Sequence, residues 1–214
     1  MKILGKFFGA VGRYVMLMGK VFSRPEKAGI YYRRTINEIE ALGINSIPLV
    51  AIISVFIGAV ITLQMALTLE SPFIPKFMIG YATRETMFLE FSSTVVAIIL
   101  AGKVGSNIAS EIGTMRITEQ IDAMDMMGIN SAGFLVLPKV TAATLLSPFL
   151  MLFSLALGLV GGWIVVSATH IIPPPSYITG IKAFYNGFYI FYSCFKISIK
   201  AETLFLVSFL CVRS

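Results

Sequence analysis

Long apolar runs separated by short polar stretches dominate this chain. From Ile44 to Leu69 there are 26 residues without a charged side chain. At about 1.5 Å per residue, a helix of that length crosses a hydrocarbon core of about 30 Å. Pro48 falls in the first turn, where a proline loses no helical hydrogen bond. The pattern therefore predicts a first membrane span at 44–69.

Two further apolar segments follow in the sequence. One runs from about residue 87 to 105 and carries a single acid, Glu90, near its outer end. The other runs from about 134 to 168, where Pro138 and Pro148 could kink the helix or split off a leading piece. Both are long enough to cross a bilayer. We expect three firm spans in total.

The intervening stretches are more polar. Residues 70–86 contain prolines and charges and are expected to form an external connection, whereas 106–133 forms a cytoplasmic segment.

Residues 188–211 are apolar enough to begin a fourth span, but three charges interrupt them: Lys196, Lys200 and Glu202. Each such residue costs about 2.5 to 3.5 kcal/mol at the bilayer centre. Only a partial fourth span is expected there.

The N-terminal region has a different pattern. In residues 1–23, apolar side chains with several phenylalanines share one helical face and cations fall on the opposite face. This distribution favours an interfacial helix over an ordinary amphipathic helix packed on protein. A second, more polar elbow helix is expected from Pro25 to about Leu42.

These elements predict an all-α, polytopic membrane protein. We divide it into interfacial and elbow helices at 1–43, a membrane-spanning core at 44–187, and a C-terminal segment at 188–214. The core includes a cytoplasmic segment at 108–133.

Composition agrees with a membrane protein. Of the residues, 57% are hydrophobic and 13% are charged, about half the charged share of a soluble domain. The net charge is +6, and eight of the 17 Lys and Arg precede residue 35. A basic flank beside a span indicates a cytoplasmic N-terminus. No soluble basic face is visible, so we expect no nucleic-acid partner.

The residues give little support for catalysis by this chain. One histidine, His170, and two cysteines, Cys194 and Cys211, have no metal-site or disulfide spacing. A P-loop is lacking, because Val104 follows Gly102-Lys103 and alanine occupies position 97. We expect no catalytic residues, metal or cofactor, and any ATP hydrolysis must occur on a separate chain.

The polar stretch 110–128 is the most informative part of the sequence. An apolar stripe of Ile117, Ile121 and Met124 with charges around it predicts a short amphipathic helix, and Gly128 is expected to cap its C-terminus. Such a helix suits docking into a groove of a soluble partner. A solvated loop helix without a partner fits the spacing equally well.

Several segments together resemble one family. They are Val55–Gln64, Ala101–Ser106, Ala109–Ala123, Met126–Asn130 and Leu137–Lys139. They are similar to MlaE-type permeases (the YrbE family), the membrane subunits of ABC transporters associated with MCE proteins. The resemblance covers roughly residues 30–187.

The resemblance implies a phospholipid transporter. Such permeases are five-span homodimers in the bacterial inner membrane, bound to two copies of an ABC ATPase, to MCE-domain proteins and in some systems to a STAS-domain protein. They move phospholipids or similar lipids between the inner and outer membranes. By this match, the polar stretch is the segment that couples to the ATPase. Its candidate contacts are Glu111, Gly113, Thr114, Arg116, Thr118, Glu119 and Asp122.

Further candidates lie in the spans. Glu90 is an ionisable residue in an apolar segment, which marks either a functional site or a side chain that reaches the outer interface. It falls where the family carries a glutamate, and Gln64 and Thr62 are expected to accompany it in a lipid pathway or gate. Close helix packing is expected at five glycines. They are Gly58, Gly102, Gly105, Gly158 and Gly162.

The sequence departs from the family near its end. After about Ser193 the resemblance is lost, and the chain stops at Ser214 without a complete fourth span or a fifth. A non-transporting, truncated membrane scaffold is therefore one alternative function. An ion-coupled secondary transporter is another, although a single intramembrane acid and the lack of a visible inverted repeat count against it. The particular lipid and the direction of transport do not follow from hydropathy.

Overall fold

The computed structural model describes Gly12 and residues 28–69, 71, 73–128, 131–185 and 187–212. The expected interfacial helix at 1–23 lies outside these ranges, except for Gly12. The chain divides into two compact units. Unit 1 comprises Met1–Ile44, Leu100–Leu146 and Ala201–Ser214, and unit 2 comprises Asn45–Ile99 and Ser147–Lys200.

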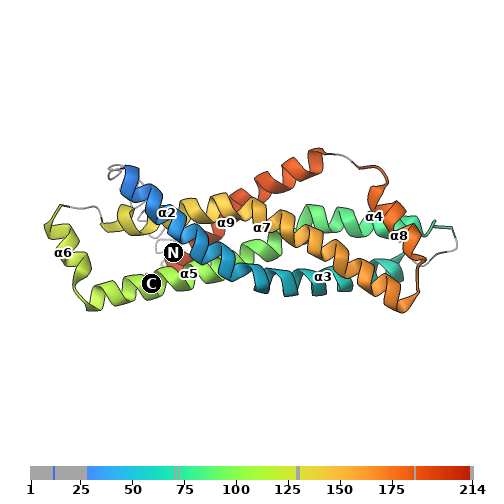
Figure 1. The fold of residues 1–214 in the computed structure, drawn as a ribbon, viewed down its shortest axis with the longest axis horizontal. Helices are drawn as coiled ribbons and strands as arrows, with labels where there is room; N and C mark the ends of the chain where they lie inside the picture. Colours follow the sequence, from blue (N-terminus) through green and yellow to red (C-terminus); the bar gives the residue numbers. More distant parts are fainter. Residues whose placement is uncertain are drawn as a thin grey trace, which may run out of the picture. The chain divides into compact units, whose positions relative to one another are not determined.

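All regular elements in the described ranges are helical (Figure 1). In chain order they are α2 (Ala28–Gly43), η1 (Ile44–Ser46), α3 (Ile47–Thr68), α4 (Phe77–Thr86), η2 (Met87–Phe91), α5 (Ser92–Ile117), α6 (Gln120–Met126), α7 (Ser131–Thr169), α8 (Pro174–Lys182) and α9 (Phe188–Val212). The all-α prediction is confirmed.

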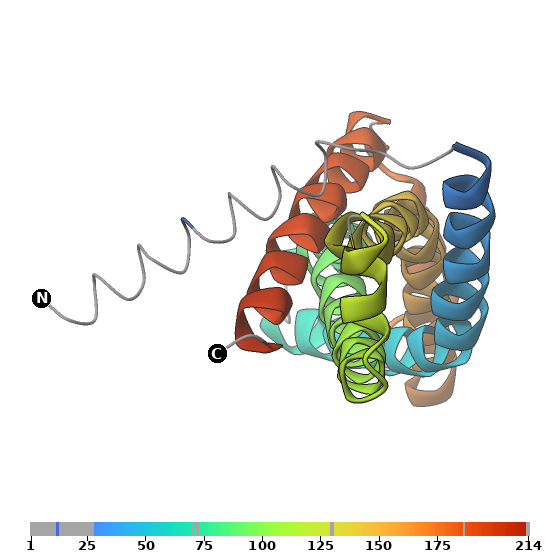
Figure 2. The same cartoon turned by 90° about the vertical axis from the view of Figure 1, so that its left-hand side faces the viewer.

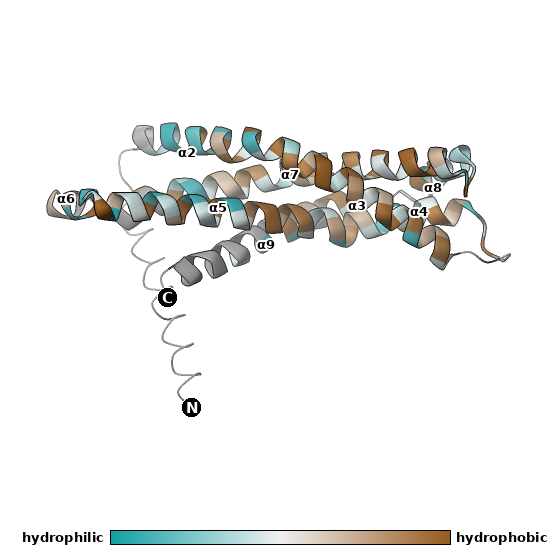
Figure 3. Ribbon diagram, turned by 90° about the horizontal axis from the view of Figure 1, so that it is seen from below, coloured by the Kyte–Doolittle hydropathy of each residue, from teal (hydrophilic) through white to brown (hydrophobic). Residues whose placement is uncertain are grey.

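Three helical stretches in the described part of the chain are long and apolar enough to cross a membrane. They are Tyr31–Thr68, Phe77–Ile117 and Leu137–Thr169. Hydrophobic residues predominate in α3 and in the later part of α7, whereas α2 is largely hydrophilic (Figure 3). Each of the three predicted spans overlaps one of these stretches almost completely, as expected of a multi-pass membrane protein.

The later part of the predicted external connection at 70–86 is helical. Helix α4 begins at Phe77 and continues through η2 into α5. Prolines and charges in this stretch indicate a connection rather than a helix, yet the side chains of Arg84 and Glu85 are only 2% and 14% exposed. The Arg84 guanidinium donates to the carbonyl oxygens of Ile181 (2.6 Å) and Ala183 (2.7 Å), which replaces the hydration lost on burial.

Helix α7 passes through both of its prolines without interruption. A proline removes one helical donor and frees the carbonyl group four residues before it, a loss that membrane helices tolerate. The sequence left open either a kink or a split at Pro138 or Pro148. The unbroken helix excludes the split.

Each unit has its own apolar core. In unit 1, Leu42 of α2 packs with Val104 and Ile108 of α5 and with Ala142 and Ala143 of α7. The core of unit 2 lies among α3, α4, α7 and α8. Its buried members are Ala66, Ile79, Val166, Ile172 and Tyr177.

Small residues bring α3 and α7 close together in unit 2. A Cβ atom added to Gly161 would lie 2.2 Å from the carbonyl oxygen of Val55. The Ser54 hydroxyl donates a 2.8 Å hydrogen bond to the Ser154 hydroxyl in the interior. Close approach of small residues with a hydroxyl hydrogen bond is a typical means of helix association in membranes.

Candidate functional site

The predicted coupling segment is divided by a sharp turn rather than forming one helix. Helix α5 continues to Ile117, and α6 begins at Gln120. Between them Glu119 has φ 56°, a left-handed conformation that is uncommon for a residue with a side chain. Figure 2, which views the molecule from the side of α6, shows this short helix after the end of α5. Gly128 follows α6 with φ 75°, as expected for a glycine that ends a helix.

Most of the predicted coupling residues are exposed. Arg116, Glu119 and Asp122 are exposed and carry charges of both signs. Exposed apolar side chains lie beside them, since Ile117 is 84% and Met126 is 89% exposed. Exposed apolar and charged groups therefore occur together at this turn.

The coupling candidates without a charge, Gly113, Thr114 and Thr118, are also exposed. Gly113 is exposed, with no atom within 4 Å of an added Cβ. The hydroxyl of Thr114 donates to the carbonyl oxygen of Ser110 (3.0 Å), and that of Thr118 donates to Thr114 (2.9 Å). Both hydroxyls therefore donate to backbone carbonyl groups of α5.

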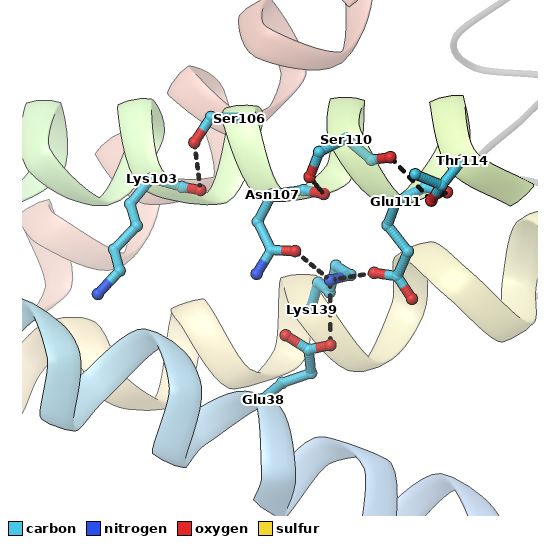
Figure 4. A network of polar contacts seen from close by, with 8 residues as sticks. All are labelled: Glu38, Lys103, Ser106, Asn107, Ser110, Glu111, Thr114 and Lys139. Carbon is cyan, nitrogen blue, oxygen red and sulfur yellow. Dashed lines mark hydrogen bonds and ion pairs between the residues drawn. The ribbon is translucent and has the colours of Figure 1, made fainter.

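Glu111 belongs to a network of polar contacts around the buried ammonium of Lys139 (Figure 4). The Lys139 ammonium is 2.5 Å from a carboxylate oxygen of Glu111, 3.0 Å from one of Glu38, and donates to the Asn107 amide oxygen at 3.0 Å. The Lys139 side chain is 4% exposed, against 31% for Glu111 and 21% for Glu38. One ammonium from α7 thereby links α2 to α5.

Sequence reasoning missed the role of Lys139 in this network. In the sequence, Lys139 stands out only as part of the segment Leu137–Lys139. A usable signal existed, because Lys139 is a cation near the start of an apolar stretch that spans Leu137–Thr169. Such a cation needs an acidic partner or access to water. Which acids approach it depends on the packing of α2 and α5, which spacing does not reveal.

Glu90 lies in η2, a π-helical turn between α4 and α5, and its side chain is exposed. Single π-helical turns inside α-helices are frequent at functional sites. Helix α9 packs against the turn through polar side chains. Ser193 donates to the carbonyl oxygen of Phe88 (2.7 Å), and Lys196 donates to that of Leu89 (2.6 Å).

Lys200 continues this face of α9. Its ammonium donates to the Thr94 hydroxyl at 2.6 Å, and Glu90 contributes an electrostatic attraction to it. Residues 193, 196 and 200 recur at helical spacing, so they share one face. Sequence reasoning treated the two lysines only as obstacles to a span. Instead, they bring two ammonium groups into the part of unit 2 that also carries the Glu90 carboxylate.

The structure separates the other two lipid-pathway candidates. Thr62 is 1% exposed and donates to the carbonyl oxygen of Gly58 (2.8 Å), whereas Gln64 is exposed. An added Cβ on Gly162 would be 2.3 Å from both the Thr62 and the Tyr177 hydroxyl oxygens. Thr62 therefore belongs to the packing of α3 with α7 and α8.

A cavity of about 450 Å³ lies at another position in unit 2. Neither Glu90 nor either candidate on α3 lines it. Its walls are formed by Ala66, Leu69, Ser71, Ile74, Pro75, Lys76, Ile79, Ile171 and Ile172.

The five glycines chosen for helix packing have different surroundings. A Cβ on Gly58 would lie 1.9 Å from the carbonyl oxygen of Gly158, and one on Gly158 would meet the Met87 methyl carbon at 2.1 Å. Together with Gly162, they lie at crowded positions. Gly102 has open space around it, and Gly105 is half-buried.

A comparison with known proteins identifies the family. The model of the family described as "Permease MlaE" matches residues 35–211. The chain belongs to the MlaE permease family. The match extends beyond Ser193, so the expectation that the resemblance ends there is wrong. Two of the three charges that interrupt the apolar pattern of α9, Lys196 and Lys200, contact η2 and α5.

Individual relatives agree with this assignment. A protein of Synechocystis named as a probable ABC transporter permease is 33% identical over 84% of this chain and 68% of its own length. A Rickettsia bellii protein with the same description is 33% identical over 73% of this chain and 60% of its own length. The intermembrane phospholipid transport system permease protein MlaE of Haemophilus influenzae is 29% identical, over 74% of this chain and 60% of its own length.

Proposed function

We propose that this MlaE-family chain is the permease subunit of an ABC transporter that moves phospholipids or similar lipids between the inner and outer membranes. The proposal rests mainly on the family match, which covers residues 35–211. The name of the Haemophilus influenzae relative, a phospholipid transport permease, supports the choice of substrate class. The permease is a multi-pass protein of the bacterial inner membrane with a cytoplasmic N-terminus.

ATP hydrolysis occurs on a separate ATPase that docks on the segment 108–133. The exposed charges and apolar side chains at the turn between α5 and α6 support this assignment, because a docking surface needs both. Two copies of the permease form a homodimer with a lipid-accepting cavity. MCE-domain proteins, and in some systems a STAS-domain protein, complete the assembly.

Glu90 takes part in the lipid pathway or its gating. The cations of α9 near η2 support this role, since an acid and two lysines in an apolar setting can hold a zwitterionic or anionic headgroup by charge. An ion-coupled transporter would instead need intramembrane acids at matching positions in two halves.

The decisive experiment is co-purification of this chain from membranes after expression with its genomic neighbours. Mass spectrometry then identifies the associated proteins and lipids. Recovery of an ATPase, an MCE-domain protein and phospholipid supports the proposal. Recovery of the ATPase without lipid or transport activity favours a non-transporting scaffold, and recovery of the chain alone contradicts the proposal.

A further inference from the structure

One buried ammonium joins three helices at the part of unit 1 that leads into the coupling segment. Lys139 of α7 contacts Glu38 of α2 and both Asn107 and Glu111 of α5 (Figure 4). A lysine ammonium has three donors, and the three contacts use three different acceptors. The network therefore occupies the full donor capacity of Lys139.

We propose that Lys139 is a positioning residue for energy coupling, an inference that rests on the proposed function. Through Glu111 it holds the helix that carries the coupling segment, and through Glu38 it holds α2. Movement imposed on α5 and α6 by the ATPase is thereby passed to α2 and α7. The helices respond together instead of bending separately.

The location of Glu111 supports this role. It lies six residues before Ile117, the last residue of α5. At about 1.5 Å per residue this is about 9 Å along one continuous helix. A force applied at the exposed turn reaches the Lys139 contact through hydrogen-bonded helix, without an intervening loop.

Burial makes the link stiff. Hydrogen bonds between ionised groups are shorter and about twice as strong as neutral ones, and low dielectric strengthens them further. Separating the Lys139 ammonium from either acid would leave a charge in an enclosed site with fewer partners. The helices that carry these groups are therefore held in one relative arrangement.

The same three helices also share an apolar core. Leu42, Val104, Ile108, Ala142 and Ala143 pack together in unit 1. That core supplies nonspecific adhesion between α2, α5 and α7, because apolar contact has little directional preference. The Lys139 network adds directional contacts that fix how these three helices are aligned with one another. Transmission of movement from one helix to the next requires this fixed alignment.

The two acidic arms are unequal. One oxygen of Glu38, Oε2, is buried without a hydrogen-bond partner. Glu111 is bound more closely, at 2.5 Å against 3.0 Å, and lies on the helix that continues into the coupling segment. We expect loss of the Glu111 arm to impair coupling more than loss of the Glu38 arm.

The test uses the permease with its co-purifying ATPase in phospholipid vesicles. It measures lipid transferred per ATP hydrolysed, together with the amount of ATPase bound. The variants are Glu111→Gln, Glu38→Gln and the conservative Lys139→Arg. Glu40→Gln is the matched control, because Glu40 lies two residues from Glu38 on α2 and is exposed.

We expect Glu111→Gln to reduce lipid transferred per ATP hydrolysed about fivefold, compared at equal amounts of bound ATPase because Glu111 also lies in the proposed docking segment. Glu38→Gln, outside that segment, should cause a smaller decrease in the same ratio. Lys139→Arg should retain most of the coupling because it keeps the charge, and Glu40→Gln should match wild type. A lower transport ratio at equal ATPase binding would not arise from a purely structural role.

Two results would overturn the inference alone. One is a wild-type transport ratio in both glutamine variants. The other is loss of both variants from the membrane, which would mean that the network serves folding only. A wild-type chain that binds no ATPase would instead overturn the proposed function, and this inference with it.

Discussion

Gly58 and Gly158 bring the backbones of α3 and α7 into direct contact. A Cβ atom added to Gly58 would lie 1.9 Å from the Gly158 carbonyl oxygen, a backbone atom that cannot rotate away as a side chain can. Any residue larger than glycine at position 58 must therefore push the two helices apart.

Substitution of Gly58 by alanine should destabilise the protein. Overpacking of a close contact costs about 1 to 3 kcal/mol, which exceeds the gain of about 1 kcal/mol in helix propensity. We expect the melting temperature in detergent, followed by intrinsic fluorescence, to fall by about 4 °C. Gly102→Ala is the control, because its added Cβ meets no atom within 4 Å. Equal melting temperatures for the two variants would contradict the contact.

Replacement of Arg84 by methionine should loosen the end of α8. The guanidinium is 2% exposed and satisfies the carbonyl oxygens of Ile181 and Ala183. Each buried carbonyl group left without a donor costs about 1 to 3 kcal/mol. We expect faster hydrogen exchange around residues 179–185, measured by mass spectrometry. Lys182→Met removes an exposed cation nearby and should leave exchange unchanged; the same rates in both variants would argue against the Arg84 contacts.

Stability at high pH should depend on Tyr177 of α8. Burial raises the pKa of its phenol above the ordinary value of 10, and the hydrogen bond with Thr62 opposes part of that rise. The neutral phenol therefore stabilises the fold fully below about pH 10. That contribution is lost as pH rises from about 10 through the raised pKa.

A Tyr177→Phe variant tests this dependence. It lacks the ionisable group, so its melting temperature should fall less steeply than that of wild type above pH 10. The two proteins are otherwise identical, so the difference between them isolates Tyr177. If the melting temperatures of the two proteins fell in parallel above pH 10, Tyr177 would not control stability at alkaline pH.

Reversal of the charge at Arg116 should weaken ATPase association. Arg116 is exposed on the last turn of α5, within the proposed docking segment. Like-charge contact with the partner surface should reduce co-purified ATPase about tenfold, while the amount of permease in the membrane stays unchanged. Lys182→Glu makes the same charge change on α8 and should have no effect. Undiminished recovery with Arg116→Glu would remove this residue from the docking surface.

Periodicity and apolar length were enough to predict the helical class and the three spans. They also predicted the end of α6, because Gly128 has the positive φ that glycine tolerates. Helix α4 was missed because Arg84 was assumed to be exposed, and its buried acceptors come from residues about 97 positions away. The same limit applies to Lys139, whose partners Glu38 and Glu111 lie on other helices. Hydropathy scores a residue alone, whereas burial of a charge depends on tertiary partners.

The π-helical turn η2 also affects how this chain should be aligned with its relatives. One wide turn carries an extra residue compared with regular helix, so the side chains before Met87 are rotated by about 100° relative to the register that begins at Ser92. A single helical wheel drawn over Phe77–Ile117 would assign Arg84 and Glu90 to the wrong faces. A homologue that lacks the extra residue would need a one-residue gap here in the alignment. Without that gap, each α4 residue of this chain would be aligned with the residue next to its true counterpart.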